Sequence, residues 1–399
     1  MQIYDYKVVK INADVVDGKV VLEATGPLSI AAKPILNKIN AVFQEEKPIS
    51  VTDDKIIFST WIPEIPGPVF NRMINAQIGH SLLNKRTPDQ LSVGVTPRCP
   101  NKCIHCGAAD MMVPNNEMTA EEIEKSVNQA LDMGTYLVTI DGGEPMVRND
   151  LPEIISAIDK TKTTVSMFTS GFRLDDERAG KLKEAGLYSA KISFDSADPK
   201  EHDKVRGRAG AFEGAVDAVK AAKNAGIMTD MYLTVSPHNI DSIEDLYQLA
   251  ADLEMDEMSM AGIIAVGNWK DREDEVITRT DAKRLENFHK SKNSNPEGPR
   301  VTALPYLMSP EMFGCFAGSR WMHVGSTGDV MPCPYTPLSF GNIRDVPLTQ
   351  VWSDMGKFPA YKKQSSVCLM RDTEFRQKYI HTIPKDAQLP YYSGPKPKN

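Results

Sequence analysis

Six short apolar runs alternate with segments of helical periodicity between residues 91 and 267. The runs are rich in Val, Ile, Leu, Met and Thr, as expected for buried strands. They span residues 91–96, 136–141, 163–171, 189–198, 227–235 and 257–267. This alternation predicts a parallel α/β sheet, either open and doubly wound or closed toward a barrel. In both architectures the chemistry lies at the carboxyl ends of the strands.

Three of the six cysteines follow the first of these strands in the segment "CPNKCIHC", as Cys99, Cys103 and Cys106. A structural zinc site closes with four ligands, and the one further donor on this loop is His105, which lies between two cysteines. A [4Fe–4S] cluster held by three thiolates instead leaves one iron with an open position. The residues alone leave both a zinc site and an iron–sulfur cluster open.

Other unusual residues follow the later strands. A "GGEP" segment follows the second strand and consists of Gly142, Gly143, Glu144 and Pro145. The fourth strand ends with Ser193 and Asp195, and the sixth with Gly267 and Asn268. Each of these could be an ordinary turn or strand end, and only their order around the cysteine loop suggests a shared site.

The Cys99-x3-Cys103-x2-Cys106 loop, the GGEP segment and the "SFD" after the fourth strand resemble the radical S-adenosylmethionine (SAM) superfamily over roughly residues 91–270. The resemblance implies a partial (β/α)6 TIM barrel and a [4Fe–4S] cluster whose open iron is chelated by SAM. It implies reductive cleavage of SAM to a 5′-deoxyadenosyl radical, which abstracts a substrate hydrogen. It also implies a low-potential electron donor, ferredoxin or flavodoxin.

By the same resemblance, the GGEP segment would lie against the methionyl amino group of SAM, where glycines permit close approach of the main chain. Ser193 and Asp195 would face the ribose or methionine end, and Arg206 would bind the SAM carboxylate. Gly267 and Asn268 would approach the adenine, and the His105 ring would pack against the nucleoside.

A second trio of cysteines, Cys315, Cys333 and Cys368, lies in the C-terminal third of the chain. The spacing Cys315-x12-Gly328-x4-Cys333 resembles the first half of SPASM and Twitch extensions, which implies an auxiliary iron–sulfur cluster. A non-cysteine ligand, a water or the substrate would complete it. Asp329, His323 and Tyr335 are nearby donors among which the sequence does not choose. The alternative is three free thiols in a packed cap.

The pattern predicts four regions. Residues 1–85 form a small N-terminal α+β domain, with a hairpin through Asp17-Gly18, a helix over 30–46 and a strand over 55–62. Residues 86–275 form the radical SAM core, and residues 276–389 form an irregular Fe–S-binding cap. Residues 390–399 form a disordered tail.

The composition and charge of the chain exclude some kinds of binding partner. The net charge is −7 and no long basic stretch occurs, which argues against a nucleic-acid partner. No run of about 18 apolar residues suggests a membrane span. The first residues lack the basic and apolar regions of a signal peptide, so a cytoplasmic protein with reduced thiols is expected.

The first functional hypothesis is a radical SAM enzyme that modifies a peptide or protein side chain, with the N-terminal domain as a docking element. A second is a radical enzyme acting on a sugar, a nucleoside or a tetrapyrrole precursor. A third is cobalamin-dependent C-methylation, although the chain has no Asp-x-His-x-x-Gly motif to support cobalamin binding. The last is a non-catalytic metal-binding protein.

Overall fold

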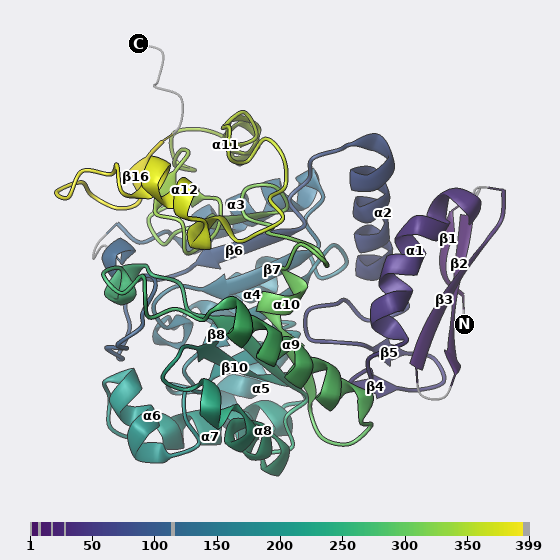
Figure 1. Cartoon of the computed structure of the whole chain (residues 1–399), viewed down its shortest axis with the longest axis horizontal. Helices are drawn as coiled ribbons and strands as arrows, with labels where there is room; N and C mark the ends of the chain where they lie inside the picture. Colours follow the sequence, from purple (N-terminus) through teal and green to yellow (C-terminus); the bar gives the residue numbers. More distant parts are fainter. Residues whose placement is uncertain (1, 7–8, 17–18, 28, 113–115, 394–399) are drawn as a thin grey trace.

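The computed structural model describes residues 2–6, 9–16, 19–27, 29–112 and 116–393. A large sheet surrounded by helices forms the body of the molecule, with the N-terminal domain on one side and the C-terminal cap over it (Figure 1). The large sheet has nine strands in the order β12-β11-β10-β9-β8-β7-β6-β13-β14.

The six predicted strands all form, and each pairs in parallel with the next. They are β6 (Gln90–Gly94), β7 (Leu137–Asp141), β8 (Thr164–Thr169), β9 (Ser189–Ser193), β10 (Met228–Val235) and β11 (Glu257–Gly262). Their buried side chains, together with those of the surrounding helices and the cap, form one large hydrophobic core. The expectation of a partial parallel α/β barrel is confirmed.

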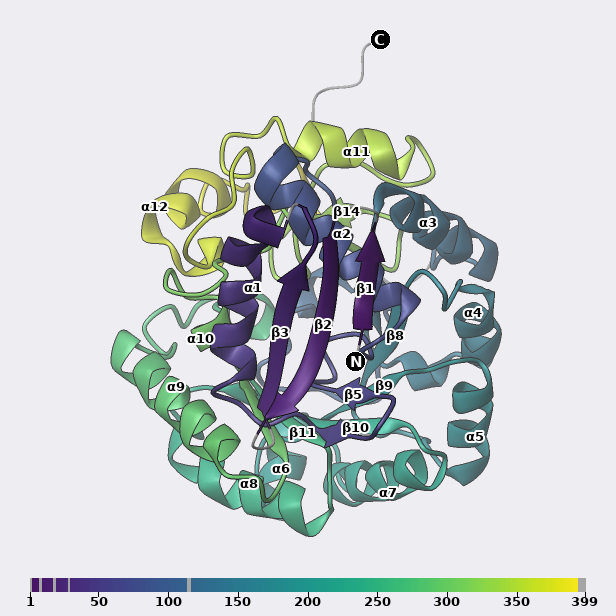
Figure 2. The same ribbon diagram turned by 90° about the vertical axis from the view of Figure 1, so that its right-hand side faces the viewer.

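The helices between the strands form an arc around the outside of the sheet (Figure 2). They are α3 (Ala120–Met133), α4 (Leu151–Ala157), α5 (Asp176–Glu184), α6 (Pro199–Arg206), α7 (Ala211–Asn224) and α8 (Ile243–Asp252). The first begins at a capping box, in which Thr119 and Glu122 each accept the other's backbone N–H. The short helix α6 was not expected from the sequence, and it lies beside the cysteine loop.

The sequence suggested that the alternation of strands and helices ends near residue 275, but in the structure it continues beyond that point. Helix α9 (Arg279–Ser294) leads into β12 (Arg300–Ala303), which pairs in parallel with β11. Beyond the short helix α10 (Leu304–Leu307), β13 (Trp321–Val324) pairs in parallel with β6 at the other edge. The antiparallel strand β14 (Val330–Met331) completes that edge. Each of the two added parallel strands has four residues and lies among Gly and Pro residues. Such short runs show no recognisable strand pattern, so the sequence did not predict them.

The N-terminal region has its own core beneath a three-stranded antiparallel sheet. Its elements are β1 (Gln2–Tyr6), β2 (Val9–Val16), β3 (Lys19–Thr25), α1 (Ser29–Phe43), β4 (Ser50–Val51), β5 (Ile56–Ile57) and α2 (Pro68–Leu83). The expected turn at Asp17-Gly18 lies outside the described residues, but the flanking Val16 and Lys19 pair as hairpin neighbours. The strand expected over 55–62 is wrong beyond Ile57, because the following residues turn into the barrel.

That turn fastens the N-terminal domain to the amino-terminal end of the barrel strands. The Thr60 hydroxyl donates to Glu257 Oε2 (2.7 Å) and accepts from Lys191 Nζ (2.8 Å), and Ser59 Oγ donates to Glu257 Oε1 (2.9 Å). Lys191 also forms an ion pair with Asp230 (2.7 Å), and both are buried. Because these charged groups are paired and hydrogen-bonded, their burial is tolerated.

The C-terminal cap contains α11 (Leu348–Met355), α12 (Thr373–Phe375) and a two-stranded sheet of β15 (Leu338–Ser339) and β16 (Tyr391–Tyr392). The expectation of a tail from residue 390 is therefore wrong for Tyr391 and Tyr392, since both pair with β15. Residues 394–399 lie outside the described part. Within the described ranges, no helix is long and apolar enough to cross a membrane.

Candidate functional site

The first cysteine loop follows β6 and is held by backbone hydrogen bonds from two sides. At the end of α6, the carbonyls of Arg206 and Val205 accept from the N–H groups of Lys102 (2.9 Å) and Ile104 (3.0 Å). On the other side, Asn268 donates its N–H to the Cys106 carbonyl (3.0 Å) and its side-chain amide to the Cys103 carbonyl (2.8 Å). The loop conformation is therefore fixed by neighbours that are remote in sequence.

Glycines permit this close packing. Gly267 has φ +56°, and a Cβ there would overlap the Cys106 carbonyl oxygen. A Cβ on Gly143 would overlap the Arg98 carbonyl oxygen, while the Gly143 N–H donates to the Thr96 carbonyl (2.7 Å). The GGEP segment and the turn that begins at Gly267, after β11, thus lie directly against the backbone of the cysteine loop, where no larger residue fits.

The three thiols are half-buried. Burial raises the pKa of Cys99 to about 11, and the backbone N–H of Asn101 acts in the opposite direction. Burial also raises the pKa of Cys106, opposed by the N–H groups of Ala108 and Ala109. Backbone N–H groups directed at the sulfurs stabilise the thiolate form of the cysteines. The loop therefore fits an iron–sulfur cluster, in which iron would take the place of the thiol protons.

Arg206 lies against the same sulfur set, with Nη1 3.8 Å from Cys103 Sγ. Its Nε forms an ion pair with Asp195 Oδ2 (2.6 Å), and His105 Nε2 lies 3.5 Å from Asp195 Oδ1. The structure therefore brings together three residues that the sequence placed around SAM. The carboxylate of Asp195 is engaged by Arg206 and His105.

Glu144 has a different role from the one expected. Its carboxylate is buried and accepts from Thr169 Oγ1 (2.7 Å), Ser170 N–H (2.7 Å) and Ser170 Oγ (2.6 Å). This side chain is committed to the loop after β8 and is not free to contact a ligand. Pro145 is likewise buried, at the start of a 3-10 turn, and Ser193 is the last residue of β9. The main chain of the GGEP segment remains the part that faces the cysteine loop.

The second trio of cysteines forms a compact group in the cap. The thiols of Cys315 and Cys368 share a hydrogen bond, which lowers the pKa of Cys368 to about 7 and raises that of Cys315. Cys333 is buried, and burial raises its pKa to about 11. The hydrogen bond with the Thr336 hydroxyl opposes that rise. Backbone N–H groups two residues along the chain face all three sulfurs, a donor set that again suits thiolate ligands.

The non-cysteine donors considered from the sequence have other partners. Ser92 Oγ lies 2.9 Å from His323 Nδ1. Asp329 accepts from Thr327 Oγ1 (2.9 Å) and from Ser339 Oγ (3.2 Å). Burial raises the pKa of Tyr335 to about 12, and its hydrogen bond from Tyr232 opposes that rise.

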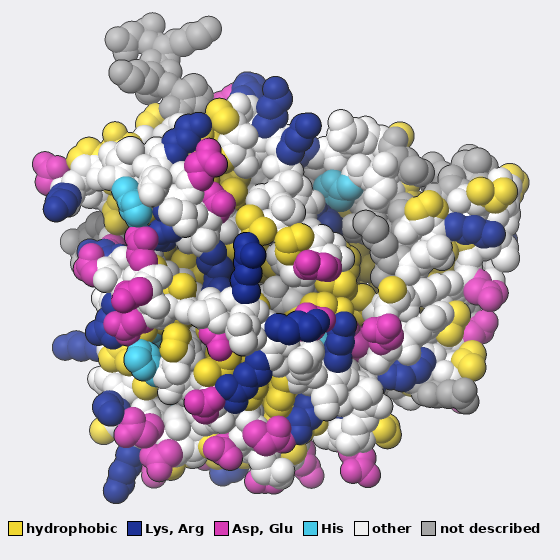
Figure 3. Space-filling view, viewed as in Figure 1, with side chains coloured by type: hydrophobic (Ala, Val, Ile, Leu, Met, Phe, Trp, Pro, Cys, Tyr) yellow, Lys and Arg dark blue, Asp and Glu magenta, His cyan; other side chains and the backbone are white. Residues whose placement is uncertain are grey.

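One cavity of about 1460 Å³ connects the two cysteine sites through the barrel. A Cβ on Gly107 would lie 3.2 Å from the ring of Tyr335, so the segments carrying Cys106 and Cys333 are in direct contact. The wall includes residues from the first cysteine loop, the second cysteine site and the N-terminal domain: Cys106, Cys315, Cys333, Cys368, Phe58 and Trp61. On the face drawn in Figure 3, hydrophobic side chains gather between the N-terminal domain and the rest of the molecule.

Asp141 is a candidate functional residue that the sequence reasoning missed. It ends β7 and lines the cavity, its Oδ1 is buried without a hydrogen-bond partner, and its Oδ2 lies 3.7 Å from His323 Nδ1. Burial raises the pKa of Asp141 to about 7 and lowers that of His323 to about 3. A carboxylate at the carboxyl end of a barrel strand was the signal that could have found it.

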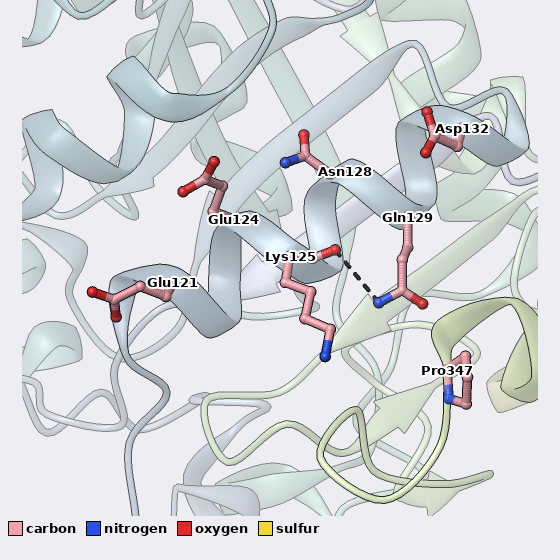
Figure 4. A pocket seen from close by; sticks show the side chains of 7 residues that line it. All are labelled: Glu121, Glu124, Lys125, Asn128, Gln129, Asp132 and Pro347. Atoms are coloured by element: carbon pink, nitrogen blue, oxygen red, sulfur yellow. Dashed lines mark hydrogen bonds between the residues drawn. The ribbon is translucent and has the colours of Figure 1, made fainter.

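A second depression, of about 450 Å³, lies on the outer face of α3 against Pro347 (Figure 4). Its side chains include Glu121, Glu124 and Lys125, and no cysteine is among them. Gln129 at this place accepts from the N–H of Leu348, so it joins α3 to α11. The large cavity is therefore the candidate site.

Comparisons with known proteins bear on both halves of the chain. A model described as the radical SAM superfamily matches residues 93–250, and one described as an iron–sulfur cluster-binding domain, SPASM, matches residues 315–377. A protein named AdoMet-dependent heme synthase from Methanosarcina barkeri (strain Fusaro / DSM 804) is 27% identical over 68% of this chain and 84% of its own length. A protein of the same name from Nitratidesulfovibrio vulgaris is 28% identical over 68% of this chain and 80% of its own length.

Solved structures share the fold. Streptococcus suis SuiB, bound to precursor peptide SuiA, matches with a TM-score of 0.58 at 18% identity over 88% of both chains. The anSMEcpe structure with bound AdoMet matches with a TM-score of 0.53 at 19% identity, over 66% of this chain and 80% of that chain.

Proposed function

We propose a function for a chain that belongs to the radical SAM superfamily and carries a SPASM domain: hydrogen abstraction from a peptide or protein side chain held between its two cysteine sites. As a radical SAM enzyme, the protein uses a [4Fe–4S] cluster with SAM, and its SPASM domain implies a further iron–sulfur cluster.

We assign Cys99, Cys103 and Cys106 to the SAM-binding cluster, and Cys315, Cys333 and Cys368 to the auxiliary cluster. The chemistry that the bound cluster and SAM supply is the generation of a 5′-deoxyadenosyl radical. Arg206 beside Cys103 offers a guanidinium to the SAM carboxylate, and Asp195 holds that guanidinium in place. The remaining contacts proposed for SAM are the main chain of Gly142, Gly143 and Pro145, together with Ser193, His105, Gly267 and Asn268.

The observation that carries the proposal is the single cavity reaching both cysteine sites. A substrate in it lies near the site where hydrogen is removed and near a second site able to accept an electron. Asp141 offers an unpartnered carboxylate oxygen to an N–H or O–H of such a substrate. A ferredoxin or flavodoxin would supply electrons to the first cluster.

Two features favour a peptide. The cavity of about 1460 Å³ is not confined to the two cysteine sites but continues to Phe58 and Trp61 of the N-terminal domain. The sheet of that domain has β1 at one edge, where an extended peptide could add as a strand, whereas at the β3 edge Asn40 already bonds the N–H and carbonyl of Leu22 (both 2.8 Å). SuiB, which shares the fold, was solved with a precursor peptide.

A small-molecule substrate such as a tetrapyrrole is the second candidate, motivated by the relatives named AdoMet-dependent heme synthase. The cavity wall includes Arg371, which is largely buried and donates to the carbonyls of Ile263 (2.7 Å) and Ile277 (3.5 Å). Burial lowers the pKa of Arg371. A carboxylate of a bound substrate would be a favourable partner for such a guanidinium.

An anaerobic reaction of the reconstituted chain with SAM and dithionite tests the proposal. Peptides encoded beside the gene and a tetrapyrrole bearing propionate side chains are added separately, and 5′-deoxyadenosine and substrate mass are measured. We expect a peptide to raise nucleoside formation above the substrate-free rate and to change in mass. Stimulation by the tetrapyrrole alone would overturn the peptide assignment in favour of the second candidate.

A matched variant separates substrate turnover from SAM cleavage. Replacing Cys315, Cys333 and Cys368 together by Ala should leave substrate-free nucleoside formation intact and stop substrate modification. Full modification by this variant would show that the auxiliary site is not needed.

A further inference from the structure

A buried pair of hydroxyl groups lies behind the auxiliary cysteines. Thr336 is 1% exposed, and its Oγ1 lies 3.2 Å from the sulfur of Cys333. The backbone N–H groups of Tyr335 and Thr336 also face this sulfur, so the turn that begins at Cys333 surrounds it with donors. The Thr336 hydroxyl is the side chain able to donate in that set.

Tyr361 lies behind Thr336 and is fully buried. Its ring packs between Phe340 and Phe358, each with a centroid 5.7 Å away, and a Cβ on Gly318 would collide with it. Its hydroxyl oxygen is buried without a hydrogen-bond partner. Leaving a buried polar group without a hydrogen bond is costly, so this hydroxyl is expected to gain a partner in the loaded protein.

The electrostatics connect this hydroxyl to the cysteine group. Burial raises the pKa of Tyr361 well above its usual value, and the nearby sulfurs of Cys333 and Cys315, which in their ionised form repel a phenolate, raise it further. The hydroxyl of Thr336 lowers it, which identifies Thr336 as the polar neighbour of the phenol. The phenol therefore stays protonated and available as a donor.

We propose that Thr336 and Tyr361 are positioning residues that set the reduction potential of the auxiliary iron–sulfur cluster. In the loaded protein, the Thr336 hydroxyl donates to the sulfur of Cys333, and the Tyr361 hydroxyl, which has no partner in this structure, donates to Thr336 Oγ1. A hydroxyl that accepts a hydrogen bond becomes a better donor, and the aromatic walls exclude competing water. Hydrogen bonds to the ligand sulfur stabilise the more negative reduced cluster and so raise its potential. The inference rests on the proposed assignment of Cys315, Cys333 and Cys368 to a cluster.

Potentiometric titration followed by electron paramagnetic resonance tests the proposal on the full chain. In a parent variant, Cys99, Cys103 and Cys106 are replaced by Ala, so that only the auxiliary cluster is reconstituted. T336V should titrate at a lower potential than the parent, and Y361F should shift in the same direction by less. T336S keeps the hydroxyl and should match the parent, as should T382V, which removes the exposed Thr382 hydroxyl.

A second readout reports on the hydrogen bond itself. Pulsed spectra recorded in D₂O should contain an exchangeable deuteron coupled to the parent cluster, with reduced intensity in T336V. Unchanged potentials and spectra in T336V and Y361F at full iron content would overturn the role of these hydroxyls but leave the assignment of the auxiliary cluster in place. If T336V binds less iron, Y361F decides by the same criterion. A parent that binds no iron would overturn the auxiliary cluster itself, and this inference with it.

Discussion

Two carboxylates near the carboxyl edge of the barrel, Asp195, which is buried, and Asp141, which is partly buried, have opposite environments. Burial disfavours the charge of Asp195, but the Arg206 guanidinium prevails and holds the pKa of that carboxyl below its usual range. Asp141 has no such cation, and burial raises its pKa to about 7. Asp195 is therefore a fixed anion that orients Arg206, whereas Asp141 can hold or release a proton near neutral pH.

The environment of Asp141 predicts a pH-dependent effect of D141N on stability. An unfolded Asp titrates near its ordinary value of about 3.9, so the folded chain binds more protons between there and about pH 7. Stability contributed by the protonated carboxyl is lost as the pH rises through this window. D141N removes the charge, so it should raise the thermal midpoint by more at pH 8.5 than at pH 6. At the higher pH, the gain in the free energy of unfolding should be on the order of a few kcal/mol.

The exposed Asp252 provides the control, because D252N has no burial penalty to remove. Thermal unfolding of the reconstituted proteins at both pH values gives the comparison. An equal effect of D141N at pH 6 and pH 8.5 would contradict a raised pKa at this site.

Gly267 predicts a specific loss of metal. Because Gly267 has a left-handed backbone and a Cβ there would overlap the Cys106 carbonyl oxygen, G267A should displace the first cysteine loop. Reconstituted G267A should lose about four irons, the content of one [4Fe–4S] cluster, and with them SAM cleavage. Iron analysis and nucleoside formation measure both losses.

G180A is the matched change, because no atom lies within 4 Å of a Cβ at Gly180 in helix α5. It should retain all iron and stabilise the chain by roughly 0.4–1 kcal/mol. Full iron content in G267A would mean that this contact does not hold the loop.

At the level of elements, the sequence predicted what depends on long, regular periodicity. The six strands from β6 to β11 are the example. It did not predict β12 or β13, since four residues carry no period and their place is decided by pairing with β11 and β6. It extended β5 too far because hydrogen bonds from Ser59 and Thr60 to Glu257, remote in sequence, override the local strand pattern.

The same turn predicts how strongly the N-terminal domain is joined to the barrel. T60V removes a hydroxyl that donates to Glu257 and accepts from Lys191, leaving buried charged groups with fewer partners. We expect a loss of about 1–3 kcal/mol in the free energy of unfolding. Thermal or denaturant unfolding followed by circular dichroism measures it.

T52V is the control, since Thr52 is exposed and its hydroxyl bonds to Asp54 within the same loop. Its effect should stay within about 0.5 kcal/mol. Equal stability of T60V and T52V would mean that the buried network does not fasten the two parts.

At the level of the whole molecule, one cavity joins three regions of the chain: the first cysteine loop, the second cysteine site and the N-terminal turn. The sequence indicated the two cysteine sets separately, through their spacing. It could not show that Tyr335 packs on Gly107, nor that Trp61 reaches the lumen, because such contacts depend on tertiary packing. For the same reason, the sequence suggested Glu144 as a contact of SAM, although its carboxylate accepts hydrogen bonds from Thr169 and Ser170.

The most direct test of the account is anaerobic SAM cleavage by the reconstituted full chain, measured together with its iron content. The wild type should bind about eight irons and form 5′-deoxyadenosine with dithionite. Replacing Cys99, Cys103 and Cys106 by Ala should remove about half of the iron and all nucleoside formation. Replacing Cys315, Cys333 and Cys368 should remove the other half and spare substrate-free cleavage. An iron-loaded wild type that forms no 5′-deoxyadenosine would contradict the central claim.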